Sequence, residues 1–183
     1  MRETYGDNLD IDWKPFYLAQ ANSNEGPEWK AWEQEEDSAT LGLQAFAAAE
    51  AAARQGTAAF EGFMLAMLRA RHEDRKDLSD ENVILDAAQT ARLDMARFRE
   101  DMKDPTIIPE TGKSHIEAVE EHGVFGVPTF IFPNGASAFL KAYVPPDEDA
   151  VGMFEDLTDV MSKWKFIGEV KRPQPPWPKG VFA

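Results

Sequence analysis

A long helical stretch without any strand pattern constrains the fold of this chain most. From Ser38 to about Phe98, apolar residues recur at the three- and four-residue spacing of amphipathic helices. Gly56 and a charged turn at 69–77 divide the stretch into separate helices. β-Rich segments lie only outside it, so we expect a small sheet combined with a helical subdomain. The predicted N-caps of its helices are Ser38, Thr57 and Ser79.

The helix that follows Gly56 has apolar residues at the i, i+3, i+4, i+7 and i+8 positions of one buried face, namely Phe60, Phe63, Met64, Met67 and Leu68. The pattern predicts core packing rather than a cofactor pocket. The residues expected to be buried in the helical subdomain are Phe60, Met64, Leu68 and Ile84.

Two segments before the helical stretch have distinct patterns. Residues 9–18 alternate apolar and polar at Leu9, Ile11 and Trp13, which predicts a half-buried strand that Pro15 brings to an end. Residues 20–37 are polar and acidic, which predicts a loop and then a short helix.

The region after residue 104 changes from helical to β-type periodicity. A loop with Pro105 and Pro109 precedes a helix predicted over 113–122, which Gly123 ends. Two β-rich runs, 127–132 and 136–143, flank Pro133-Asn134-Gly135, and an Asn-Gly pair in this setting predicts a hairpin. Asp147 is the expected cap of a last amphipathic helix, and the proline-rich residues 171–183 predict an extended tail.

Composition excludes several classes of function. Lys and Arg number 19 against 33 Asp and Glu, and the net charge of -14 argues against nucleic-acid and membrane-surface partners. No apolar run approaches the roughly 20 residues that cross a bilayer. The chain has no cysteine, which excludes thiolate nucleophiles, disulfides, zinc–thiolate sites and iron–sulfur clusters within these residues.

The histidines give no metal-site pattern. His115 and His122 lie on one predicted helix among glutamates, a pattern more typical of a solvated helix face than of ligands. The chain also lacks a catalytic serine elbow, a phosphate-binding glycine loop and a dinucleotide fingerprint. We therefore expect no cofactor, no metal and no catalytic residue among these 183 residues.

One segment stands out, Gly123-Val124-Phe125-Gly126-Val127-Pro128-Thr129-Phe130. Its proline directly precedes an apolar strand, where no ladder hydrogen bond is lost. Residue chemistry alone leaves open a cis proline in a tight functional turn and a trans proline that opens a strand.

This segment, followed by a hairpin, resembles the cis-proline loop of the DsbA-like branch of the thioredoxin superfamily. Further segments are similar to the FrnE-like DsbA thiol–disulfide oxidoreductases, which are related to 2-hydroxychromene-2-carboxylate isomerases. They are Asp12–Leu18, Glu25–Gln34, Asn134–Phe139 and Arg172–Trp177. The resemblance implies an α/β thioredoxin-like fold with an all-helical insertion. It divides the chain into a core remnant (1–37), the insertion (38–104), the rest of the core (105–170) and the tail (171–183).

The family places a Cys-x-x-Cys pair between a first strand and a first helix, and this sequence has no counterpart to that segment. We therefore expect an N-terminally truncated oxidoreductase. A glutathione-dependent isomerase or transferase with a serine there, and a degenerate peptide- or partner-binding member, stay open as alternatives.

The resemblance assigns substrate binding to Gly126, Val127, Pro128 and Thr129, with the Val127 backbone contacting an extended peptide or glutathione. The expected partners are protein thiols or disulfides, or a glutathione-like substrate, in the cytoplasm, and a homodimer is left open.

Overall fold

The computed structural model describes residues 2–34 and 42–170. These residues form two compact units: a larger one from Trp13 to Gly126, and a smaller one from the described parts of 1–12 and 127–183. The boundaries of the four segments expected from the sequence do not coincide with those of the two units. The four-segment division stays a prediction. The predicted Ser38 cap and the proline-rich tail lie outside the described residues.

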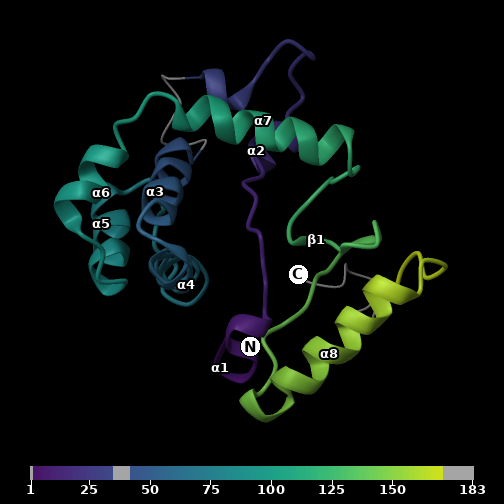
Figure 1. The fold of residues 1–183 in the computed structure, drawn as a ribbon. Helices are drawn as coiled ribbons and strands as arrows, with labels where there is room; N and C mark the ends of the chain where they lie inside the picture. Colours follow the sequence, from purple (N-terminus) through teal and green to yellow (C-terminus); the bar gives the residue numbers. More distant parts are fainter. Residues whose placement is uncertain (1, 35–41, 171–183) are drawn as a thin grey trace. The chain divides into compact units, whose positions relative to one another are not determined.

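The larger unit is a bundle of four helices followed along the chain by a further helix (Figure 1). Its main helices are α3 (Leu43–Ala53), α4 (Thr57–His72), α5 (Glu81–Thr90), α6 (Met95–Asp101) and α7 (Ile107–Glu120). Two short elements precede them, α2 (Leu18–Ala21) and the 3₁₀ turn η2 (Ala31–Glu33). The bundle core is built from alanines of α3 and larger side chains of α4, α5 and α6, among them the fully buried Phe63, Ile84 and Phe98.

The buried face predicted for α4 is confirmed only in part, at Phe63 and Met67. Phe63, Met67 and Ala70 are buried, whereas Leu68 is 43% exposed. Phe60 and Met64 are only partly buried, while Ile84 on α5 is fully buried as expected. The helix carries two adjacent apolar stripes, and packing selects the one whose Phe63 ring meets Phe98 of α6, with centroids 5.7 Å apart.

The helix N-caps also differ from the predictions. Asp80, not Ser79, caps α5, because its carboxylate accepts the Asn82 N–H at 2.9 Å. The Ser79 N–H is bonded to Asp77 instead. Gly56, with φ of 107°, occupies the cap position of α4, and Thr57 is already helical.

Helix α7 begins six residues earlier than predicted, at Ile107. Pro109 lies in its first turn, where a backbone N–H has no partner within the helix, so the missing donor costs nothing. The predicted stop is confirmed: the helix ends at Glu120, and Gly123 adopts φ of 64° and donates its N–H to the Val119 carbonyl.

The strand predicted over residues 9–18 does not form. In the described chain, β1 and β2 pair with each other in a two-stranded sheet, so 9–17 has no ladder to join. Ile11 and Trp13 are 40% and 47% exposed instead of lining a buried face. Alternating residues therefore mark an extended segment here, and α2 follows it directly.

The smaller unit contains α1 (Arg2–Tyr5), η1 (Gly6–Asn8), β1 (Thr129–Ile131), β2 (Ser137–Phe139) and α8 (Asp147–Lys163). The predicted hairpin is confirmed: the strands are antiparallel with Thr129 opposite Phe139, and Gly135 turns the chain with φ of 77°. Asp147 is the first residue of α8 and Pro146 its N-cap, so Asp147 acts through its charge at the helix start rather than as a cap.

The amphipathic face expected for α8 is only half covered, because the helix has no buried residue. The Asn134 amide in the hairpin turn donates to the Ser162 carbonyl near the end of α8, which ties the two elements together. Within residues 2–34 and 42–170, no helix is both long and apolar enough to span a membrane.

Candidate functional site

The Val127–Pro128 peptide lies at the entrance to β1 and is exposed to solvent. Its peptide bond is cis, and the Val127 side chain is 44% exposed. Within the described residues, neither the N–H nor the C=O of Val127 has a hydrogen-bond partner. An exposed residue with both backbone groups open can bond the backbone of an extended ligand.

The hairpin fixes the position of this peptide. The Pro128 carbonyl accepts the Leu140 N–H at 3.1 Å, one step beyond the pairing of Thr129 with Phe139. The antiparallel register thus continues past the end of the strands.

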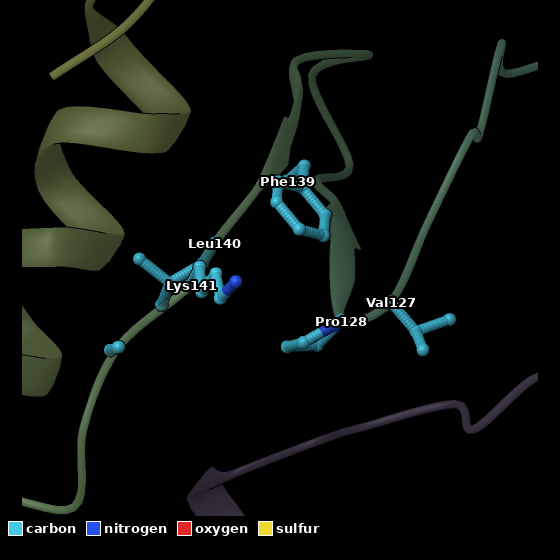
Figure 2. A pocket seen from close by; sticks show the side chains of 6 residues that line it. Val127, Pro128, Phe139, Leu140 and Lys141 are labelled. Carbon is cyan, nitrogen blue, oxygen red and sulfur yellow. The ribbon is translucent and has the colours of Figure 1, made fainter. Parts of the chain in front are cut away.

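A hollow of about 320 Å³ opens beside Val127 and Pro128. Figure 2 shows the Phe139 ring and the side chains of Leu140 and Lys141 on the hairpin's second segment, and Pro128 and Val127 on the first. The lining is apolar except for one ammonium group. It consists of Val127, Pro128, Phe139, Leu140, Lys141 and Ala142.

The structure brings two of the four predicted site residues together. Val127 and Pro128 line the hollow. Thr129 is half-buried as the first residue of β1 and does not line it. Gly126 is buried and is the last residue of the larger unit.

Sequence reasoning missed the second side of the hollow, from Phe139 to Ala142. The signal was present, because the Asn-Gly turn that predicts the hairpin also sets which residues lie opposite each other. Counting back from the turn places Phe139 across from Thr129, and Leu140 donates its N–H to the Pro128 carbonyl.

His115 was predicted to be solvated, and it is instead buried, with 4% of its side chain exposed. Its Nδ1 accepts the backbone N–H of Tyr17 at 3.1 Å, so the ring is neutral. Burial lowers the pKa of His115, and the charge of Lys30 lowers it further. The residue is part of the core.

A second buried polar contact lies beside this histidine. The Tyr17 hydroxyl lies 2.6 Å from the Thr111 hydroxyl, and burial raises the Tyr17 pKa. The rings of Trp32 and Phe46 pack on Tyr17, with centroids 5.4 and 4.3 Å away. The hydrogen bonds of Tyr17 with His115 and Thr111 join the segment before α2 to α7, and the ring contacts join it to η2 and α3.

One group of side chains has the donor set of a metal site. Possible ligand atoms of Glu117, Glu121 and His122 lie within 4.8 Å of one another at the end of α7. All three side chains are exposed. Exposed acidic groups of this kind are usually solvated, as the sequence pattern predicted, and we assign no metal to them.

Comparison with known proteins gives one family match. The family model described as a DSBA-like thioredoxin domain matches residues 1–157, which is most of the chain. A search of curated proteins found no match.

Proposed function

This chain belongs to the family of DSBA-like thioredoxin domains, and we propose that it supplies the substrate-docking part of a thiol–disulfide oxidoreductase. The family supports thiols or disulfides as the general substrate class. The docking loop that we assign is Val127–Pro128 with the facing residues Phe139–Ala142.

The observation that carries this proposal is the open backbone of Val127. Its N–H and C=O have no partner among the described residues, and the side chain is nearly half exposed. Such a residue can pair with an extended peptide as a strand would, while the neighbouring hollow takes an apolar side chain of that peptide. Main-chain pairing suits an enzyme that acts on many protein substrates, because it does not depend on their sequence.

Thiol–disulfide exchange itself needs a thiolate that attacks a disulfide sulfur and forms a mixed disulfide. None of the 183 residues is a cysteine. The proposal therefore places the redox pair in sequence outside these residues and leaves to this chain the holding of the substrate. Cytoplasmic location stays a prediction from the resemblance.

Nuclear magnetic resonance on the full 183-residue chain tests the docking role. The probe is a capped, apolar hexapeptide with a central serine in place of the substrate cysteine. We expect it to shift the amide resonance of Val127 and those of Leu140 and Lys141. The matched control peptide carries N-methyl groups on the central amides and cannot pair with a backbone. Equal shifts with both peptides, or no shift at Val127, would contradict the proposal.

A genomic reading tests where the chemistry resides. The DNA upstream of the Met1 codon is translated in frame. A Cys-x-x-Cys motif there supports the oxidoreductase. A serine without cysteine at that position favours a glutathione-dependent isomerase or transferase, and an immediate stop codon favours a protein that only binds.

A further inference from the structure

The last helix of the smaller unit, α8, has an apolar side that the described part of this unit leaves uncovered. The helix contains no buried residue, and Phe154, whose ring lies 5.8 Å from that of Tyr5, marks the side that meets α1. About a quarter of a turn away, at helical spacing, lie Met153, Val160 and Trp164, which we call the α8 stripe. Val160 is 37% exposed and Trp164, directly after the helix, is 60% exposed. The α8 stripe is therefore an apolar surface in contact with water.

Acidic residues border the α8 stripe. Asp149 lies four residues before Met153 and Asp156 lies three residues after it, so both carboxylates lie alongside the stripe. Both side chains are exposed, and within the described residues neither carboxylate forms a hydrogen bond or an ion pair. The helix as a whole has six acidic residues against one lysine. Such a surface suits a ligand that combines apolar side chains with positive charge.

The sequence after residue 170 has this composition. Residues 171–183 contain no acidic residue in a chain whose net charge is -14. Their three cations are Lys171, Arg172 and Lys179. Large apolar residues, among them Trp177 and Phe182, alternate with four prolines that disfavour both helix and strand. No regular element is therefore expected to bury these apolar side chains within the segment itself.

The connection to α8 and the length of the segment allow it to reach the stripe. After the helix, the Ile167 N–H donates to the Trp164 carbonyl at 3.1 Å, and this turn leads the chain off the helix axis. Figure 1 shows the loop curling at the end of α8. The 17 residues of α8 extend about 25 Å, whereas residues 171–183 as extended, proline-rich chain span about 40 Å. The segment is long enough to run back along the helix, and its attachment gives it a high effective concentration there.

We propose that residues 171–183 form an intramolecular strap over the α8 stripe. Trp177 and Phe182 contact the apolar residues of the stripe. The cations of the strap lie beside Asp149 and Asp156. Charge complementarity selects this occupant over a second copy of the chain, because a second copy would bring two acidic helices together. The strap is independent of the docking function proposed for Val127.

A spin label tests the strap, and the absence of cysteine from the chain makes a single label site simple to introduce. The full chain with Ala183→Cys carries a nitroxide, and the paramagnetic broadening of the α8 amide resonances is measured. We expect a maximum near Asp149 and Met153, because the strap runs back from the end of the helix towards its start. An undocked segment would instead broaden chiefly the residues near its attachment, around Lys163.

Charge variants of α8 test the bordering carboxylates. Asp149→Asn combined with Asp156→Asn should lower the ratio of docked to undocked strap about threefold at low salt, as expected for two exposed ion pairs. Glu148→Gln combined with Asp159→Asn removes the same charge from another side of α8 and should leave the ratio unchanged. Trp177→Ser should lower it as well, through the lost apolar contact.

The result that overturns the proposal is broadening that falls steadily from the end of α8 to its start. A mixture of spin-labelled protein with isotope-labelled, nitroxide-free protein identifies the source of any maximum. Broadening at Met153 in that mixture assigns the stripe to a second copy and also overturns the strap. Equal effects of the two charge variants overturn it too, as does a maximum that Trp177→Ser leaves unchanged.

Discussion

The two units of the chain differ sharply in how much apolar surface they bury. Among the residues that the structure describes, the larger unit, 13–126, contains nearly every buried apolar side chain, including the fully buried Phe63, Ile84 and Phe98. In the described part of the smaller unit, Ala136 is the one buried apolar residue. Large apolar residues there are exposed, among them Ile131, Phe139 and Val144.

The contrast means that the buried core and the candidate binding loop lie in different units of the chain. A two-stranded hairpin is at best marginally stable by itself, since it buries too little to offset its ordering entropy. The candidate docking loop therefore lies on the weakly packed unit, and we assign no function to the described residues of the well-packed unit. Binding loops are commonly drawn from the less stable parts of a protein for this reason.

The largest expected effect comes from removing a core ring of the larger unit. Phe63→Ala deletes a fully buried ring that packs on Phe98, and it should destabilise this unit by about 3–5 kcal/mol. Phe139→Ala removes the same ring at a position 40% exposed in the smaller unit, and it should cost well below half as much. Denaturant unfolding followed by circular dichroism gives both values. Similar losses in the two variants would contradict the contrast.

Two helical glycines sharpen the comparison. A Cβ on Gly112 of α7 would lie 2.7 Å from three carbons of the Trp32 ring, so Gly112→Ala should destabilise the protein by about 1–3 kcal/mol. A Cβ on Gly152 of α8 would meet nothing within 4 Å. Gly152→Ala should therefore stabilise α8 by up to about 1 kcal/mol, through helix propensity alone. Thermal unfolding measures both, and a stabilising Gly112→Ala would mean that Trp32 is not packed on α7.

Mild acid should weaken the larger unit through His115. Its lowered pKa means that the unfolded chain takes up a proton more readily than the folded one. The contribution of His115 to stability is complete above its pKa of about 6.5 in the unfolded chain. It is lost as the pH falls through the lower pKa that His115 has in the folded protein. His115→Asn keeps an acceptor for the Tyr17 N–H but does not titrate, so the unfolding free energy should change less between pH 7 and 5.

The exposed His122→Asn variant controls for the loss of a histidine as such. A pH dependence that is the same in His115→Asn and wild type would show that the core contact with Tyr17 does not sense the proton.

The smallest effect concerns the surface carboxylate of Asp104. Its pKa is lowered to about 2, chiefly by the backbone N–H and hydroxyl of Thr106 and also by Arg54 at 2.7 Å. The contribution of Asp104 to stability is present above the ordinary aspartate pKa of 3.8. It is lost as the pH falls through the folded-state pKa of about 2. Asp104→Asn should flatten the acid end of the stability curve slightly, and an unchanged curve would contradict the assignment.

The features that could be predicted from sequence are those fixed by local chemistry. Gly123 follows α7 and Asn134-Gly135 turns the hairpin, each as expected from its residue type. The failures involve choices that local chemistry leaves open. The apolar stripes Phe60/Met64 and Phe63/Met67 are equally periodic, and only the neighbouring helices select between them.

The missed strand and the misjudged histidine have the same cause. Residues 9–17 have strand-like alternation, but a strand exists only with a partner in register. His115 looked solvated among the glutamates of α7 because the segment that covers it, around Tyr17, is nearly a hundred positions earlier in the sequence. At the candidate site, the proline in the sequence is enough to predict Val127 and Pro128. The other lining residues, among them Phe139 and Lys141, can be identified only once the folded hairpin is known.

The division of the chain also has a consequence for the order in which its parts can assemble during synthesis. The larger unit is one continuous segment, 13–126, so all of its contacts are available once that segment has left the ribosome. The smaller unit is split, and the hydrogen bond between Tyr5 and Glu155 joins residues 150 positions apart. Prior folding of the intervening segment shortens the flexible chain that this contact must close, and with it the entropy of closure. The contact between α1 and α8 is thus among the last that the described chain can form, whereas the hairpin beside the docking loop is local in sequence.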